Sequence, residues 1–138
     1  MRYVSVNQLN RFDFLDRQWK ILSWTEDVFS VRVEGPDVVS GEFAGQRIAE
    51  ALVTFRGIRL EHVFTHDGMK EYSLTRERAV ARFAGVPLVV FSFYPENRQC
   101  EFCGLTDGDP IAVSFDYDAV TVEWEAFAKS SAGHLVRE

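Results

Sequence analysis

Between Gln99 and Ala128 the chain has no lysine and no arginine, although seven carboxylates lie in that stretch. They are Glu101, Asp107, Asp109, Asp116, Asp118, Glu123 and Glu125. Residues 1–98 are balanced at thirteen acidic and thirteen basic side chains, so the formal net charge of −6 comes from this stretch, slightly offset by the last ten residues. No basic cluster lies elsewhere in the chain, which argues against nucleic acid as a partner, because contacts to phosphates supply most of that affinity.

Long apolar runs are absent as well. No stretch approaches the ~20 apolar residues that span a bilayer, and the first twenty residues lack the apolar core of a signal peptide. We therefore expect a cytoplasmic protein that does not bind membranes. Only two cysteines are present, and in that compartment they stay reduced.

Aromatic residues, in contrast, are plentiful. The chain has twelve Phe, four Tyr and three Trp among its 138 residues, and 46% of all residues are hydrophobic. This content excludes a disordered chain and favours half-buried strands. The length is that of one domain, so we expect a single globular domain over residues 1–138.

The local patterns predict mostly strands. Residues Val28 to Glu34 alternate apolar and polar side chains, and the apolar run from Val86 to Tyr94 is typical of a central strand buried on both faces. Residues 46–55 fit either a helix or a strand, with strand favoured from Leu52 onward. A change of phase at Gly57 indicates a bulge or tight bend.

Two segments favour helices. Thr75 is placed to cap a helix over residues 76–84, with Gly85 just past its end. A short helix is also compatible with the spacing of apolar residues near the N-terminus, which are Leu9, Phe12, Leu15 and Trp19.

The strongest strand pattern lies in the acidic stretch. Apolar residues alternate with polar ones from Ile111 to Asp118, and they continue in the opposite phase from Val120 to Ala126. The simplest interpretation is a hairpin. The fold class predicted from all these patterns is α+β and mostly antiparallel β, a single-domain sandwich or curved sheet of six to eight strands with one or two short helices.

In such a hairpin four carboxylates share one polar face: Asp116, Asp118, Glu123 and Glu125. Like charges on adjacent strands repel each other, and water, a cation or a basic partner would relieve that repulsion. A solvated sheet face is one interpretation, and a site for a basic protein partner is the other. A cation site is disfavoured because strand carboxylates without a coordinating loop rarely form an oxygen cage.

A second candidate site combines His62 and His66 with Cys100 and Cys103. These residue types form Cys2His2 zinc sites. An extended segment would hold the two imidazoles ~13 Å apart, so a zinc site requires the chain to turn at Thr65. Otherwise the thiols are structural, on opposite faces of a strand, and His62 belongs to the core.

Some segments resemble known proteins. Phe12-Asp13-Phe14-Leu15-Asp16, the strand Val28–Glu34 and the run Leu52–Ile58 resemble small bacterial β-rich proteins of uncharacterised families, some of which are immunity proteins of polymorphic toxins. This resemblance implies a protein-binding, inhibitor-like role and transfers no functional residue.

No motif of nucleophilic catalysis or phosphate binding is present. We therefore expect a non-enzymatic cytoplasmic protein that presents its acidic C-terminal hairpin to a basic partner. The alternatives are a metal-dependent enzyme or zinc-stabilised domain that uses the His–Cys set, and a module that binds a small apolar ligand. Zinc is the only cofactor considered, and the sequence leaves the oligomeric state open.

Overall fold

The computed structural model describes residues 2–67, 70–106 and 108–128. Within them the chain forms one α-helix, α1 (Arg76–Phe83), one turn of 3-10 helix, η1 (Leu9–Arg11), and twelve strands. The strands are β1 (Tyr3–Val6), β2 (Phe12–Asp13), β3 (Arg17–Trp24), β4 (Val28–Glu34), β5 (Asp37–Val38), β6 (Glu50–Arg56), β7 (Arg59–Asp67), β8 (Lys70–Leu74), β9 (Leu88–Tyr94), β10 (Gln99–Leu105), β11 (Pro110–Asp116) and β12 (Ala119–Trp124).

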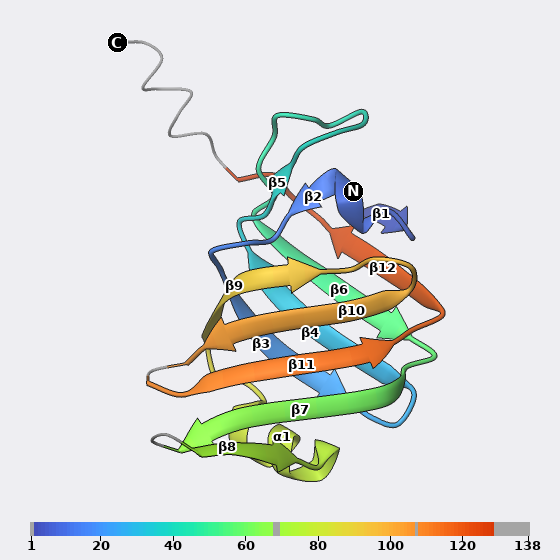
Figure 1. Cartoon of the computed structure of the whole chain (residues 1–138). Coiled ribbons are helices and arrows are strands. Elements are labelled where there is room, and N and C mark those ends of the chain that lie inside the picture. Colours follow the sequence, from blue (N-terminus) through green and yellow to red (C-terminus); the bar gives the residue numbers. More distant parts are fainter. Residues whose placement is uncertain (1, 68–69, 107, 129–138) are drawn as a thin grey trace.

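Ten strands form one antiparallel sheet in the order β1-β12-β6-β4-β3-β9-β10-β11-β7-β8, and β2 pairs with β5 in a second, two-stranded sheet. We call the first five strands of that order the rear half and the last five the front half, as Figure 1 shows them. The mostly antiparallel β class is therefore confirmed. The pairing is continuous from β1 to β8, so a sandwich of two separate sheets is not confirmed.

Aromatic side chains fill the space between the two halves. Phe29 of β4 contacts Phe115 of β11, with ring centroids 5.3 Å apart, and Phe55 of β6 contacts the same ring at 5.1 Å. Trp19 of β3 packs on Phe102 of β10 at 5.2 Å. The sheet thus bends back on itself, and the Phe-rich composition supplies the core that holds its halves together.

One prediction, that the run from Val86 to Tyr94 is a strand buried on both faces, is wrong. Strand β9 is not buried on both faces, because Leu88 and Val90 are buried whereas Val89 and Phe91 are exposed. Helix α1, which could have covered it, packs against β3 and β7 instead. The apolar run therefore has one face in the core and one in solvent.

The capped helix is confirmed. The Thr75 hydroxyl accepts a hydrogen bond from the backbone N–H of Arg78, and Gly85 has a φ of +75° just after the helix. The predicted N-terminal helix is limited to the single turn η1. The rest of that prediction is wrong, because Phe12 and Asp13 pair with β5 as a strand. No described helix is long and apolar enough to cross a membrane.

Residues 50–56 form strand β6, as favoured over a helix. Gly57 then takes a φ of +70°, and the chain passes from the rear half to β7 of the front half. The predicted bend at Gly57 is thus a crossover between the two halves.

Candidate functional site

The predicted acidic hairpin does not form. Strand β11 pairs with β10 and β7, whereas β12 pairs with β6 and β1. The backbone N–H of Tyr117 donates to the carbonyl of Arg98 in the front half, and that of Asp118 donates to Arg56 in the rear half. The phase change near Asp118 therefore marks a second crossover, from the front half to the rear half, rather than a hairpin turn between neighbouring strands.

The four carboxylates consequently do not share a face. Asp118 lies at the crossover with its carboxylate 2.7 Å from the guanidinium of Arg59, and Glu123 on β12 pairs with Arg2. Asp116 is on β11 in the other half, and Glu125 follows β12. Asp107 is outside the described residues. The prediction that these residues bind a basic partner assumed one shared face, and that face does not form. Binding of a basic partner stays a prediction.

The four candidate zinc ligands are not brought together either. Cys100 points into the core and is buried, whereas Cys103 points to the outer surface of the front half. Among the described residues no group of three His, Cys, Asp or Glu side chains is placed to hold a metal ion. His66 lies 3.7 Å from Glu71 of β8, and β7 is extended from His62 to His66, without the turn at Thr65 that a zinc site needs.

Burial governs the chemistry of both thiols. It raises the pKa of Cys100 far above its ordinary value, and it raises that of Cys103 to a smaller extent, with Glu101 adding in the same direction. Both thiols are therefore protonated at neutral pH and poor nucleophiles.

A cleft of about 610 Å³ lies at the rim of the bent sheet. Its walls are the segment from Asn7 to Leu15, which includes β2, and the loop from Pro95 to Arg98 between β9 and β10. Figure 1 shows β2 above β9 at this rim. We call this hollow the rim cleft. It draws its residues from distant segments of the chain, so sequence spacing gave no sign of it.

The lining of the rim cleft is mixed. Apolar surface comes from Leu15, Val39, Phe93 and Pro95. The lining also includes polar and charged residues, which are Asn7, Asn10, Asp13, Glu96, Asn97 and Arg98. An apolar surface with a few converging polar groups is the usual composition of a small-molecule site.

Three residues of the lining have left-handed backbones. The φ angles are +55° at Asn7, +53° at Asn97 and +59° at Arg98. Asparagine tolerates this region well, but for arginine it is unfavourable by about 1–3 kcal/mol. At Asn97 and Arg98 the tight turn between β9 and β10 accounts for this conformation, because the Gln99 N–H donates to the Glu96 carbonyl at 2.8 Å. The Arg98 side chain donates to the carbonyl of Asp118 across the crossover.

Tyr117 also lines the cleft, and its ring packs against Phe55 at 5.0 Å. Burial raises the pKa of its phenol, and nearby Arg98 opposes that shift.

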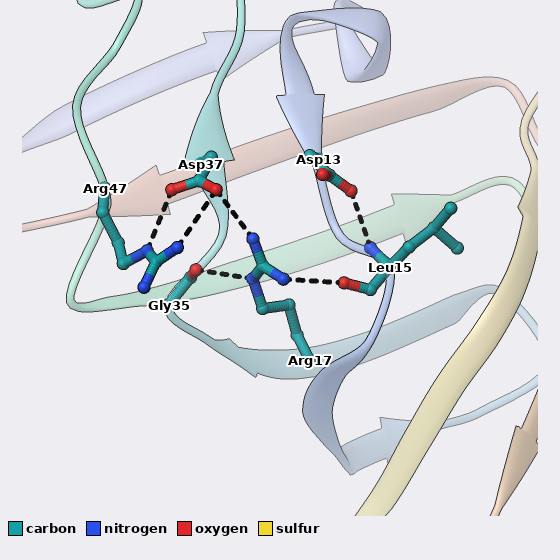
Figure 2. Close-up of polar contacts among 6 residues, drawn as sticks. All are labelled: Asp13, Leu15, Arg17, Gly35, Asp37 and Arg47. Carbon is teal, nitrogen blue, oxygen red and sulfur yellow. Dashed lines mark hydrogen bonds and ion pairs between the residues drawn. The ribbon is translucent and has the colours of Figure 1, made fainter.

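A polar cluster holds one wall of the rim cleft (Figure 2). Arg17 donates to the carbonyls of Leu15 at 2.9 Å and Gly35 at 2.8 Å, and to the Asp37 carboxylate at 2.8 Å. Arg47 approaches the same carboxylate from its other side, at 2.9 and 3.2 Å. Hydrogen bonding from Arg47 lowers the pKa of Asp37.

The carboxylate of Asp13 completes this wall by accepting the backbone N–H of Leu15 at 3.0 Å. Because Asp13 and Leu15 both line the cleft, Arg17 acts as a positioning residue for the cleft through its bond to Leu15. The sequence resemblance included Asp13 and Leu15 but assigned them no role.

Comparison of the chain with protein-family models, with curated proteins and with solved structures finds no match.

Proposed function

We propose that this protein binds a small molecule in the rim cleft. The observation that carries the proposal is the cleft itself, whose volume of about 610 Å³ is typical of small-molecule sites. The mixed lining supports it, because apolar surface together with a small number of polar groups is the usual composition of such a site. Among the sequence hypotheses, this is closest to the module for a small apolar ligand.

The charges of the lining indicate the class of ligand. Asp13 and Glu96 contribute two carboxylates against the single guanidinium of Arg98, so the lining carries a net negative charge. A cation gains from carboxylates and aromatic rings at the same time. The best-fitting ligand is a compact molecule with an apolar body and an ammonium group.

An NMR titration with two probes tests this proposal. Phenylethylammonium and phenylacetate have similar apolar bodies and opposite charges. We expect the amine to shift the backbone amides of Asn10, Glu96 and Arg98, and to bind at least about tenfold more tightly than the carboxylate. Equal binding of the two probes, or shifts confined to other regions, would contradict the proposal.

A matched pair of variants locates the binding. Val39→Trp adds an indole inside the cleft, and Val89→Trp makes the same change on the outer surface of β9, where Val89 is also exposed. We expect the first to weaken amine binding at least about tenfold and the second to leave it unchanged. Unchanged binding in Val39→Trp would exclude the rim cleft as the site.

A further inference from the structure

No described element covers the outward surface of β9, β10 and β11. Figure 1 shows these strands side by side at the front of the molecule, with helix α1 at the bottom of the view. The helix packs against β3 and β7 rather than over them. We call this surface the β9–β11 face. It is formed by the outward side chains Val89, Phe91, Glu101, Cys103, Leu105, Pro110, Ala112 and Asp116.

Apolar side chains meet at one end of this face. Val89 is directly opposite Leu105 in the β9–β10 register, and Leu105 is opposite Pro110 in the β10–β11 register. Val89, Leu105 and Phe91 are each about half exposed. A group of neighbouring exposed apolar side chains is a common mark of an interaction site.

The other end of the face is acidic. Glu101 and Asp116 point outward, because the residues on either side of them in their strands are buried. Glu101 is opposite Ser114, two residues before Asp116, so the two carboxylates are diagonal neighbours across β10 and β11. Strands β9, β10 and β11 contain no lysine or arginine.

Two arginines lie near this face, and each has a carboxylate of its own. Arg59 on β7 is opposite Asp116 in the register, but its guanidinium lies 2.7 Å from Asp118 at the crossover. Arg82 of α1 lies 3.2 Å from Asp109. The β9–β11 face therefore keeps a net negative charge, which favours a partner of positive charge.

The dimensions of the face fit one α-helix. Neighbouring strands are ~4.8 Å apart, so β9 to β11 span ~10 Å, close to the ~10–12 Å diameter of a helix with its side chains. From Leu105 to Glu101 the face is ~13 Å long, which is the length of about nine helical residues. Addition of a strand is excluded, because each of the three strands already has a neighbour on both sides.

We propose that a basic amphipathic helix of another protein docks on the β9–β11 face. Its apolar side chains cover Val89, Phe91 and Leu105, and its lysine or arginine side chains lie beside Glu101 and Asp116. A second copy of this chain is a poorer occupant, since it brings the same carboxylates and the same formal charge of −6. None of these residues lines the rim cleft, so the two sites are separate.

An NMR titration of the whole chain with two synthetic peptides of about fourteen residues tests this proposal. Both carry leucines at the helical spacing i, i+3, i+4 and i+7, and one has lysine where the other has glutamate. We expect the lysine peptide to shift the backbone amides of Val89, Phe91 and Leu105, and to bind at least about tenfold more tightly than the glutamate peptide. Equal affinities, no binding, or shifts confined to other regions would overturn the proposal.

A first pair of variants separates the face from a general attraction to an acidic protein. Glu101→Lys and Glu50→Lys change the net charge equally, but Glu50 is on the outer surface of the rear half. We expect the first to weaken binding of the lysine peptide at least about tenfold and the second to weaken it less than about threefold. Equal losses in the two variants would mean that the peptide recognises only the net charge, and the proposal would be wrong.

A second pair tests the apolar end. Val89→Ser and Val4→Ser make the same change at exposed positions on β9 and β1. The first should weaken peptide binding at least about threefold, and the second should leave it unchanged. Val39→Trp, which fills the rim cleft, should also leave it unchanged.

Two results would assign a different occupant or site and overturn the proposal. If Val39→Trp abolished peptide binding, the peptide would occupy the rim cleft. If the wild-type chain dimerised in sedimentation velocity and Val89→Ser prevented it, a second copy would cover the β9–β11 face.

Discussion

The two halves of the sheet have similar inner faces but different outer faces. The rear half carries charged side chains on its outer surface, including the pair of Arg32 and Glu50, 3.1 Å apart, and the pair of Arg2 and Glu123. In the front half, strand β9 exposes apolar side chains instead, and Phe91 is 52% exposed. The core requires apolar side chains on the inner faces of both halves. It places no requirement on the side chains of the outer faces.

This difference explains which strands were predictable. On β4 the exposed Arg32 and Glu34 alternate with buried valines, so the alternation marks the inner face. On β9 the outward positions are Val89 and Phe91, and the sequence pattern cannot distinguish them from buried residues. A strand that exposes an apolar face to solvent and a strand that is buried on both faces are both apolar at every position, so their sequences look alike.

The largest expected effect is on the inner face. Phe115→Ala removes a fully buried ring that contacts Phe29 and Phe55 of the rear half, and it should lower the free energy of unfolding by about 3–5 kcal/mol. Urea unfolding followed by Trp fluorescence measures this loss. Phe91→Ala deletes the same ring from the outer face and should cost less than about 1 kcal/mol.

If Phe91→Ala proved as costly as Phe115→Ala, the outer face of the front half would be buried in solution, and the comparison of the two halves would fail. If Phe115→Ala were nearly neutral, the aromatic contacts would not be what holds the halves together.

The sequence predicted the elements better than their pairing. Strands β11 and β12 lie where the alternation placed them, but a change of phase near Asp118 has the same pattern in a hairpin turn and in a crossover. The choice depends on the contacts of Tyr117 with Arg98 and of Asp118 with Arg56, which are distant in sequence. The rim cleft was unpredictable for the same reason, because its residues come from several separate segments.

A smaller effect is expected at the crossover that joins the halves. At Gly57 an added Cβ would lie 2.2 Å from a carboxylate oxygen of Asp118, and the φ of +70° disfavours any side chain. Gly45 has a φ of +91° with open space around it. Gly45→Ala should therefore cost about 1 kcal/mol, from backbone strain alone, and Gly57→Ala should cost more.

Combining Gly57→Ala with Asp118→Ala isolates the contribution of the clash. The double variant should recover part of the stability that Gly57→Ala loses, as measured by urea unfolding. Equal losses in Gly45→Ala and Gly57→Ala would show that the approach of Asp118 to Gly57 does not constrain the crossover.

The smallest effects are expected for the charge pairs beside the rear half. Because hydrogen bonding from Arg47 lowers the pKa of Asp37 from 3.8, the paired carboxylate stabilises the folded state above that pH. This contribution is lost as the pH falls through the pKa of the folded state. Asp37 is partly exposed, so Asp37→Asn should cost less than about 1 kcal/mol at pH 7. The difference from the wild type should shrink below pH 3.8.

Glu50→Gln provides the control, because Glu50 and Arg32 are each about half exposed and solvent screens their attraction. Its free energy of unfolding should stay within about 0.5 kcal/mol of the wild type across the same pH range. A pH dependence for Glu50→Gln as large as that of Asp37→Asn would mean that the outer charges of the rear half stabilise the sheet.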